Sequence, residues 1–491
     1  MSPAPTSTGW ALSRWLFLRL LGVVYLVAFG SLAVQVTGLI GDHGLLPAGS
    51  FLDWAHSVYG RDAYRLLPTL FWLGAGNAAL QLAAWGGVGL AILLMLGVAP
   101  MAVLALLWAL YLSFTVAGQD FLSFQWDALL LETGLLAILW APSGWLPRRG
   151  AAAPSSAIRW LLVFLLFKLM FLSGATKLLS GDPTWQHLTA LDYHFETQPL
   201  PTWVGWYAHQ LPSSIHRAAT AVMFAIELGA PWLLFAPSGL RQLRYLGVGA
   251  LLLLQSGIAL TGNYGFFNLL AMALCVPALD DDLLRRIVPL DLHPAPPARR
   301  DGRAAVRVLA PVLLCLSVLS FWAEIAYTLP GGQGQGLVPR WGLAALAWVA
   351  PLRSFNGYGL FRVMTTERPE LAIEGSRDGV HWSEYQFLWK PGPIGRRPGF
   401  VAPHHPRLDW QLWFAALDPL SNLPLLRALS ERLRTGSPDV LALLGRNPFP
   451  GDPPRFLRFA RFDYRFTTSA ERSRTGAWWR RELVGYLPQI Q

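Results

Sequence analysis

Long apolar runs with few charges recur up to about residue 328, and they restrict the possible folds more than any other feature of the sequence. A helix of about 20 apolar residues is long enough to cross a bilayer. The sequence therefore predicts an α-helical polytopic membrane protein with about nine transmembrane helices. The predicted spans lie near 16–38, 78–97, 101–117, 127–145, 159–179, 218–236, 245–261, 266–279 and 308–328. The segment 64–75 is predicted to be a partial span or a surface helix.

The composition agrees with a membrane protein and argues against a nucleic-acid-binding protein. Only 14% of the residues are charged, against about a quarter in soluble proteins. The net charge of +10 comes from Arg residues, many of which lie in short loops between apolar runs, as the positive-inside rule predicts for cytoplasmic loops. We therefore expect membrane lipid as a partner, and no nucleic acid.

The loop charges predict the orientation in the membrane. With a cytoplasmic N-terminus and nine spans, most loop Arg residues fall on the inside, and the chain after about 329 lies outside. The inner set is Arg148, Arg149, Arg241, Arg244, Arg285, Arg286, Arg299, Arg300, Arg303 and Arg307.

The sequence predicts three regions. Residues 1–328 form the transmembrane domain with a long outer loop at 180–217, and residues 329–352 form a linker or interfacial segment rich in Gly and Trp. Residues 353–491 form a β-rich extracytoplasmic domain with helical additions. Two strands are expected around a turn within 369–392, another strand within 455–466, and helix within 408–445.

Several catalytic signatures are missing from the sequence. Cys275 and Cys315 lie in apolar segments, and there is no C-x-x-C motif. No G-x-S-x-G elbow and no phosphate-binding P-loop is present, which disfavours a hydrolase or a nucleotide-driven machine. We predict no cofactor.

Several long motifs, rich in Trp, His and Pro, follow one another along the chain. They include GLIGDHGLLP (38–47), FLSFQWDALLLETG (121–134), SGDPTWQHLTALDYHFETQPLP (180–201), GNYGFFN (262–268) and HHPRLDWQLWFAAL (404–417). Together they resemble the lipase maturation factor family. The resemblance implies a polytopic protein of the endoplasmic reticulum membrane in animals, where it helps secreted homodimeric lipases fold and assemble. The high ratio of Arg to Lys looks bacterial, which would place this chain in the plasma membrane.

The segment 170–191 shows a weaker similarity to the transmembrane pattern of vitamin K-dependent carboxylases, in which a matching Lys acts as the base. On this reading Lys177 is a catalytic base. The alternative is a structural Lys that snorkels to the headgroups or pairs with an acid. Lys168 lies deeper in the same helix and needs a carboxylate partner, for which the candidates are Glu132, Glu227 and Asp127.

The outer loop holds the densest cluster of polar candidates. On an extended segment Asp192, His194 and Glu196 would share one face, and this face could hold a metal or an acid–base pair. The sequence favours a rigid, hydrogen-bonded loop over client contact, and it predicts no metal. The candidate residues of the loop are Asp182, Trp185, Asp192, His194, Glu196, Gln198 and His209.

In the outer domain, Arg407, Asp409 and Trp410 form a second cluster of candidates. We expect Arg407 and Asp409 to pair within a turn. Trp410 and Trp413 are three residues apart and so share a helical face. Core packing is favoured for them over a protein-binding hot spot.

Two functions from different classes fit these observations. The favoured one is a membrane-anchored folding or assembly factor whose outer domain holds a secreted client protein, such as a lipase. The alternative is a membrane-embedded enzyme that uses Lys177 as a base on a lipid-soluble or peptide substrate.

Overall fold

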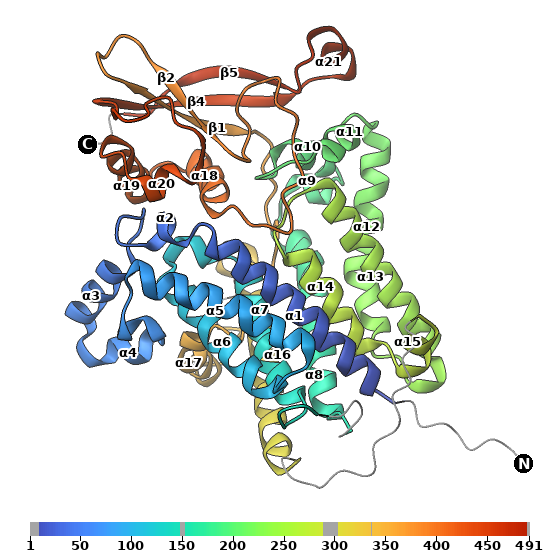
Figure 1. The fold of residues 1–491 in the computed structure, drawn as a ribbon. Helices are drawn as coiled ribbons and strands as arrows, with labels where there is room; N and C mark the ends of the chain where they lie inside the picture. The colour runs from blue at the N-terminus through green and yellow to red at the C-terminus, as the bar shows by residue number, and fades with distance from the viewer. Residues whose placement is uncertain (1–8, 148–152, 288–302, 335, 489–491) are drawn as a thin grey trace, which may run out of the picture.

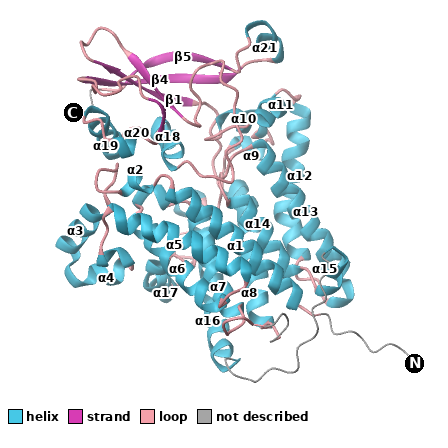
Figure 2. Cartoon of the chain, in the orientation of Figure 1, coloured by secondary structure: helices cyan, strands magenta, loops and turns pink. Residues whose placement is uncertain are grey.

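The computed structural model describes residues 9–147, 153–287, 303–334 and 336–488. A helical bundle makes up most of the molecule, and all named strands lie together at one end of it (Figures 1 and 2). Of the inner-loop residues in the orientation argument, Arg148, Arg149, Arg299 and Arg300 lie outside the described residues.

Six helices of the described chain are long and apolar enough to cross a membrane. They are α1 (Ala11–Ala33), α5 (Asn77–Leu96), α6 (Pro100–Ala117), α8 (Ser156–Leu179), α13 (Arg241–Thr261) and α16 (Arg303–Thr328).

The other three predicted spans are also helical, but they do not meet that standard. They are α7 (Gln125–Trp140), α12 (Ser213–Leu233) and α14 (Phe267–Cys275). The helix α7 has 16 residues and α14 has 9, short of the ~20 needed for a full crossing. A count of nine crossings is therefore not confirmed, whereas a predominantly helical protein with several apolar helices is.

Short helices connect the long ones. The segment 64–75 contains α4 (Ala63–Leu66) and a 3-10 turn at Leu70–Leu73, so it is an irregular connection and not a span. The segment 180–217, for which the name outer loop is kept as a label, includes the short helices α9 (Pro183–Gln186), α10 (Leu191–Thr197) and α11 (Trp203–His209). The remaining short helices are α2 (Val36–Ile40), α3 (Ala48–Tyr59), α15 (Asp281–Ile287) and α17 (Arg340–Val349).

The ends of the long helices follow from their sequences. The Ser155 side chain accepts a hydrogen bond from the backbone N–H of Ile158 and so caps the start of α8. Gly97, at φ +84°, ends α5 in the left-handed conformation that a glycine adopts without strain. The N-terminus of α1 is capped from a distance, because Asp281 accepts hydrogen bonds from the backbone N–H groups of Ala11, Leu12 and Ser13.

The C-terminal part of the chain, residues 353–488, for which the name outer domain is kept as a label, contains an antiparallel five-stranded sheet in the order β3-β2-β1-β4-β5. Its strands are β1 (Pro369–Ser376), β2 (Ser383–Phe387), β3 (Leu444–Arg446), β4 (Phe456–Phe466) and β5 (Trp479–Tyr486). Ile373 lies opposite Tyr385 on one side of β1 and opposite Phe459 on the other. The two strands expected within 369–392 and the strand expected within 455–466 are confirmed.

Helices join the sheet to the bundle. The expected helical stretch contains α18 (Arg407–Leu417), α19 (Leu423–Arg434) and α20 (Pro438–Leu441), which lie between the sheet and the bundle (Figure 1), and α21 (Ser469–Thr475) precedes β5. One cluster of buried apolar side chains runs from Leu21 of α1 through Leu412 of α18 to Ile373 of β1. The outer domain thus shares its hydrophobic core with the membrane helices.

Candidate functional site

The outer domain meets the bundle through a buried ion pair. Arg407, the first residue of α18, donates from Nη1 to Asp127 Oδ2 and from Nη2 to Asp127 Oδ1, at 2.7 Å each. Tyr111 Oη donates to the same carboxylate at 2.5 Å, and Arg407 also donates to the carbonyl of Phe121 at 2.6 Å. Charge-assisted bonds of this bidentate kind fix the orientation of both partners.

The expected pair of Arg407 with Asp409 is wrong. Both residues lie in the first turn of α18, and Asp409 instead accepts hydrogen bonds from the backbone N–H groups of Trp389 and Lys390 at 2.9 and 2.8 Å. Burial raises the pKa of the Asp409 carboxyl to about 6, in spite of those two donors. The helix therefore uses one side chain to bind the bundle and the other to bind the loop that follows β2.

Trp410 has the predicted role in the core. It is buried, with its ring centroid 4.9 Å from that of Trp126 and 5.3 Å from that of His405. Trp413 is also buried and donates from Nε1 to the carbonyl of Thr197 at 2.8 Å. This surface of α18 is thus occupied within the chain and is not a free hot spot.

Asn263, in the GNYGFFN segment, links three parts of the chain. Its Oδ1 accepts from the backbone N–H groups of Val401 and Ala402 at 2.8 and 3.0 Å. Its Nδ2 donates to the carbonyls of Leu200 and Gly399 at 3.0 and 2.9 Å. The bundle, the outer loop and the outer domain are therefore held together at one side chain.

Hydrogen bonds tie the loop at 180–217 to the rest of the chain. Asp182 caps α9 by accepting from the backbone N–H of Thr184, and its other oxygen accepts from the backbone N–H of Met364 at 2.6 Å. Trp185 donates from Nε1 to the carbonyl of Phe361 at 3.0 Å. Both contacts tie α9 to the segment that leads into β1.

The prediction that Asp192, His194 and Glu196 share one face is wrong. These residues lie on the helix α10 and not on an extended segment. Asp192 contacts His216 Nδ1 at 2.7 Å, and Glu196 accepts from the backbone N–H of Phe466 at 2.9 Å. His194 turns toward the bundle, where its Nε2 lies 3.1 Å from the hydroxyl of Tyr264.

His209 and Gln198 complete the set of predicted loop residues. The Nε2 atom of His209 lies 3.6 Å from Glu196 Oε2, and burial lowers the pKa of the His209 ring. Gln198 accepts from the Tyr264 hydroxyl at 2.8 Å. Within the described part of the chain, no three His, Cys, Asp or Glu side chains gather where they could hold a metal ion.

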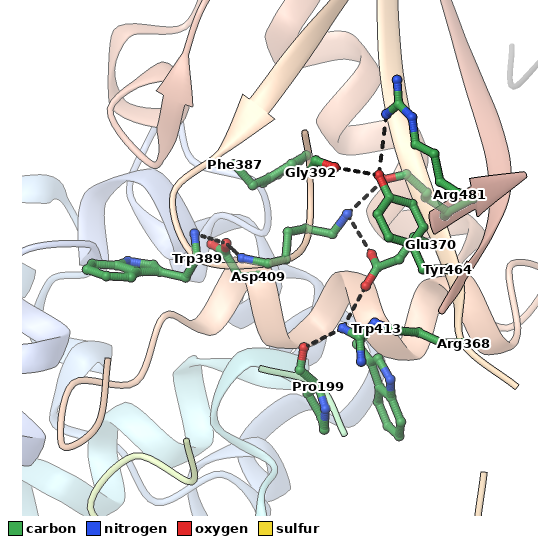
Figure 3. A network of polar contacts seen from close by, with 12 residues as sticks. Pro199, Arg368, Glu370, Phe387, Trp389, Gly392, Asp409, Trp413, Tyr464 and Arg481 are labelled. Atoms are coloured by element: carbon green, nitrogen blue, oxygen red, sulfur yellow. Dashed lines mark hydrogen bonds and ion pairs between the residues drawn. The ribbon is translucent and has the colours of Figure 1, made fainter. Parts of the chain in front are cut away.

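Arg368, which sequence reasoning missed, clamps the outer loop to the sheet (Figure 3). Its guanidinium donates to the loop carbonyls of Glu196, Gln198 and Pro199, and also to Glu370 at 2.8 Å. Lys390 lies 2.8 Å from the other oxygen of Glu370 and donates to the carbonyl of Leu371. Lys390 is the one Lys outside the apolar runs, and that rarity was the available signal.

The two intramembrane Lys residues each have an acidic partner. Lys168 lies 2.5 Å from Glu132, which identifies its partner among the three candidates. The hydroxyl of Tyr358 also donates to Glu132, at 2.7 Å. The third candidate, Asp127, is the partner of Arg407.

Lys177 is paired, so it is neither snorkelling nor a free base. Its Nζ atom is buried and donates to both oxygens of Glu227 at 2.8 Å each. The Glu227 carboxylate thus occupies the amino group of Lys177. The geometry therefore favours the pairing alternative over catalysis.

Comparison with known proteins matches both parts of the chain. A family model of the lipase maturation factor transmembrane domain matches residues 12–286, and one of the lipase maturation factor C-terminal domain matches residues 354–488. Lipase maturation factor 2 of Rattus norvegicus is 36% identical over 97% of this chain and 82% of its own length, and that of Homo sapiens is 34% identical over 98% and 83%. Lipase maturation factor 1 of Mus musculus is 33% identical over 100% of this chain and 89% of its own length. No solved structure matches this chain.

Proposed function

Because this chain belongs to the lipase maturation factor family, we propose that it is a membrane-anchored factor that helps secreted proteins, lipases among them, to fold and assemble. It is an integral membrane protein with several apolar helices. The comparisons give no support to the carboxylase-like alternative, and Lys177 is held by Glu227.

The observation that carries the proposal is the exposed edge of the outer sheet. The strand β5 lies at the end of the strand order, and among the described strands it pairs with β4 alone. Val484 is 63% exposed and Leu483 is 46% exposed. An unpaired edge with apolar side chains can add an extended segment of another chain, and a partly folded client offers such segments.

Docking of the outer domain supports the same role. Arg407 and Arg368 fix the sheet to the bundle and to the outer loop, which leaves β5 on the side remote from the bundle (Figure 1). A client strand bound there would be held at a fixed place above the membrane.

We propose further that the chain crosses the membrane nine times, with the N-terminus in the cytoplasm, and that its division into 1–328, 329–352 and 353–491 is functional. A cluster at the N-terminal end of the bundle supports this orientation. There the Arg244 Nη2 atom lies 2.8 Å from Asp280 Oδ2. The guanidinium carbon of Arg159 lies 3.8 Å from the ring centroid of Trp10. We propose the plasma membrane as the location of this chain if the source is bacterial.

Labelling of single cysteines tests the orientation. In a chain with Cys275 and Cys315 replaced by Ala, Val380→Cys places a thiol in the outer domain, and Leu240→Cys places one before α13; both positions are exposed. A membrane-impermeant maleimide added to intact cells should label the first thiol only. If only the Leu240→Cys thiol were labelled, the result would indicate the opposite orientation, with the N-terminus outside the cytoplasm.

Complementation of a gene deletion tests the function. Deletion in the native host should lower the specific activity of secreted lipases, and wild type should restore it. The variant Leu483→Glu/Val484→Glu should fail to restore it at a matched membrane level. Leu420→Glu is the matched control, since Leu420 is an exposed apolar residue of the same domain, away from β5. Unchanged lipase activity on deletion would refute lipases as clients, and full rescue by the β5 variant would refute the edge as the client site.

A further inference from the structure

A cavity of about 410 Å³ lies within the bundle beneath the outer loop. Its walls come from α8, α12 and α13, with Leu191, His194 and Phe361 at the loop end. Most of the lining side chains are apolar. The volume falls in the range of ~300–1,000 Å³ that is usual for small-molecule sites.

The cavity reaches the surface of the bundle between α12 and α13. Ala219 and Val222 of α12 and Leu253 and Gly257 of α13 line it and are exposed. The helix α13 is among those long and apolar enough to cross the membrane. An apolar rim on such a helix faces lipid, so we expect a ligand to enter from the membrane.

The charges inside the cavity are already balanced. Lys177 and Glu227 both line it, and they neutralise each other at 2.8 Å. A phosphate or carboxylate headgroup would therefore find no free cation among the described residues that line the cavity, and it would lie close to the Glu227 carboxylate. This arrangement disfavours anionic lipids.

A chain of hydrogen bonds fixes the tautomer of His194. Gln198 Nε2 donates to the carbonyls of Phe195 and Thr261, so its Oε1 is the acceptor for the Tyr264 hydroxyl at 2.8 Å. The single hydroxyl proton of Tyr264 is used in that bond. His194 Nε2, 3.1 Å from the Tyr264 oxygen, must then be the protonated ring nitrogen and donate to it.

The other ring nitrogen of His194 is consequently a bare acceptor. Nδ1 is buried and has no hydrogen-bond partner within the described chain. Burial lowers the pKa of the ring to about 4, so the ring is neutral at pH 7. A buried acceptor without a donor is costly, and His194 is among the residues that line the loop end of the cavity, where a ligand can offer a hydroxyl.

We propose that this cavity binds a monoacylglycerol from the membrane, with the acyl chain between α12 and α13 and a glycerol hydroxyl donating to His194 Nδ1. The apolar walls accommodate the chain. The neutral head matches the balanced charges, and its hydroxyl supplies the donor that His194 lacks. A fatty acid anion has no donor to offer.

The proposal is tested with the full chain in nanodiscs and a monoacylglycerol that carries a photoreactive diazirine in its acyl chain. We expect crosslinks within 213–261 that excess monooleoylglycerol suppresses and that oleate and lysophosphatidylglycerol do not. Equal suppression by the anionic lipids, or crosslinks only elsewhere, would overturn the proposal.

Paired variants locate the binding. Gly257 lines the cavity at its rim, and the space that a side chain would fill there is open, so Gly257→Trp should block entry and abolish the crosslink. Gly249→Trp is the matched control, an exposed glycine of the same helix that also has open space and does not line the cavity. Crosslinking that survives Gly257→Trp would place the lipid elsewhere.

A second pair tests the headgroup. His194→Phe keeps an aromatic ring without an acceptor, and it should weaken monooleoylglycerol competition about tenfold, as loss of one buried hydrogen bond does. His194→Asn keeps an acceptor near the Nδ1 position and should retain most of the affinity. If monooleoylglycerol competes equally well in wild type and in both variants, His194 does not bind the headgroup. The rim variants carry the test if His194→Phe fails to fold.

Discussion

Arg407 and Asp127 lie 280 residues apart in the sequence, yet they form two parallel hydrogen bonds of 2.7 Å in the buried junction between the outer domain and α7. Residues from three other places in the chain converge on this pair. Tyr111 and Phe121 bond to its side chains, and Gln35 accepts from the backbone N–H of Arg407 at 2.9 Å. This ion pair and its neighbours therefore join the C-terminal part of the chain to the bundle, together with Asn263, Arg368 and the shared core.

Arg407→Ala should destabilise the protein strongly, by roughly 3–5 kcal/mol, because it leaves the Asp127 charge buried without its partner. Thermal unfolding in detergent measures the loss. The double variant Arg407→Leu/Asp127→Leu should be less destabilised than either single variant, since no charge is left unpaired. A double variant worse than both singles would show that the pair contributes more than mutual neutralisation.

Lys177→Ala should lower the amount of folded protein in the membrane, because Glu227 then carries a buried charge without a counter-ion. Lys177→Ala/Glu227→Ala should recover much of that amount. Quantitative immunoblotting of membranes gives the levels, and secreted lipase activity per molecule gives the function. Recovered protein with no activity would support a chemical role for Lys177.

Arg368→Lys should loosen the outer loop, although it keeps the charge. A single ammonium cannot reach three carbonyls and Glu370 with the geometry of a guanidinium. Hydrogen exchange should become faster within 196–200 and stay unchanged in α1. Arg377→Lys, at an exposed position of the same domain, is the matched control.

Asp409 should give the stability a recognisable pH dependence. Its pKa is raised to about 6 in the folded chain from an ordinary value of 3.8. The protonated form is thus favoured by folding, and the free energy of unfolding should fall as the pH rises from about 4 to 6, by roughly 3 kcal/mol from this group.

Asp409→Asn keeps a side-chain oxygen to accept from Trp389 and Lys390, and it removes the titration. Thermal melts between pH 4 and 7 should show a smaller decline for this variant than for wild type. An identical pH profile for the two proteins would exclude Asp409 as the source.

The sequence predicted the long helices and the strands β1, β2 and β4, because local patterns determine them, but it did not predict β3 or β5. Apolar runs define the long helices, and turn residues separate β1 from β2. The pairing of charges was harder to predict. Three acids were candidates for Lys168, and only the adjacency of α7 and α8 selects Glu132.

Two errors have one physical cause. The spacing of Asp192, His194 and Glu196 suits a strand, but α10 packs against α11 and α12, and tertiary contacts made the segment helical. Arg407 and Asp409 were paired on proximity in sequence, whereas buried partners elsewhere in the fold bind each more tightly. Arg368 was missed because three of its four partners are backbone carbonyls, which no sequence motif reveals.

The shared hydrophobic core has a consequence for biosynthesis. Leu412 and Ile373 pack in the same cluster as Leu21, so the C-terminal part of the chain has no complete interior until the bundle has been inserted and assembled. The sheet should therefore be protease-sensitive in truncated nascent chains and become resistant only after the last strand has been translated. If the outer domain is expressed and secreted without the helices, it should therefore stay partly unfolded and be degraded by cellular proteases.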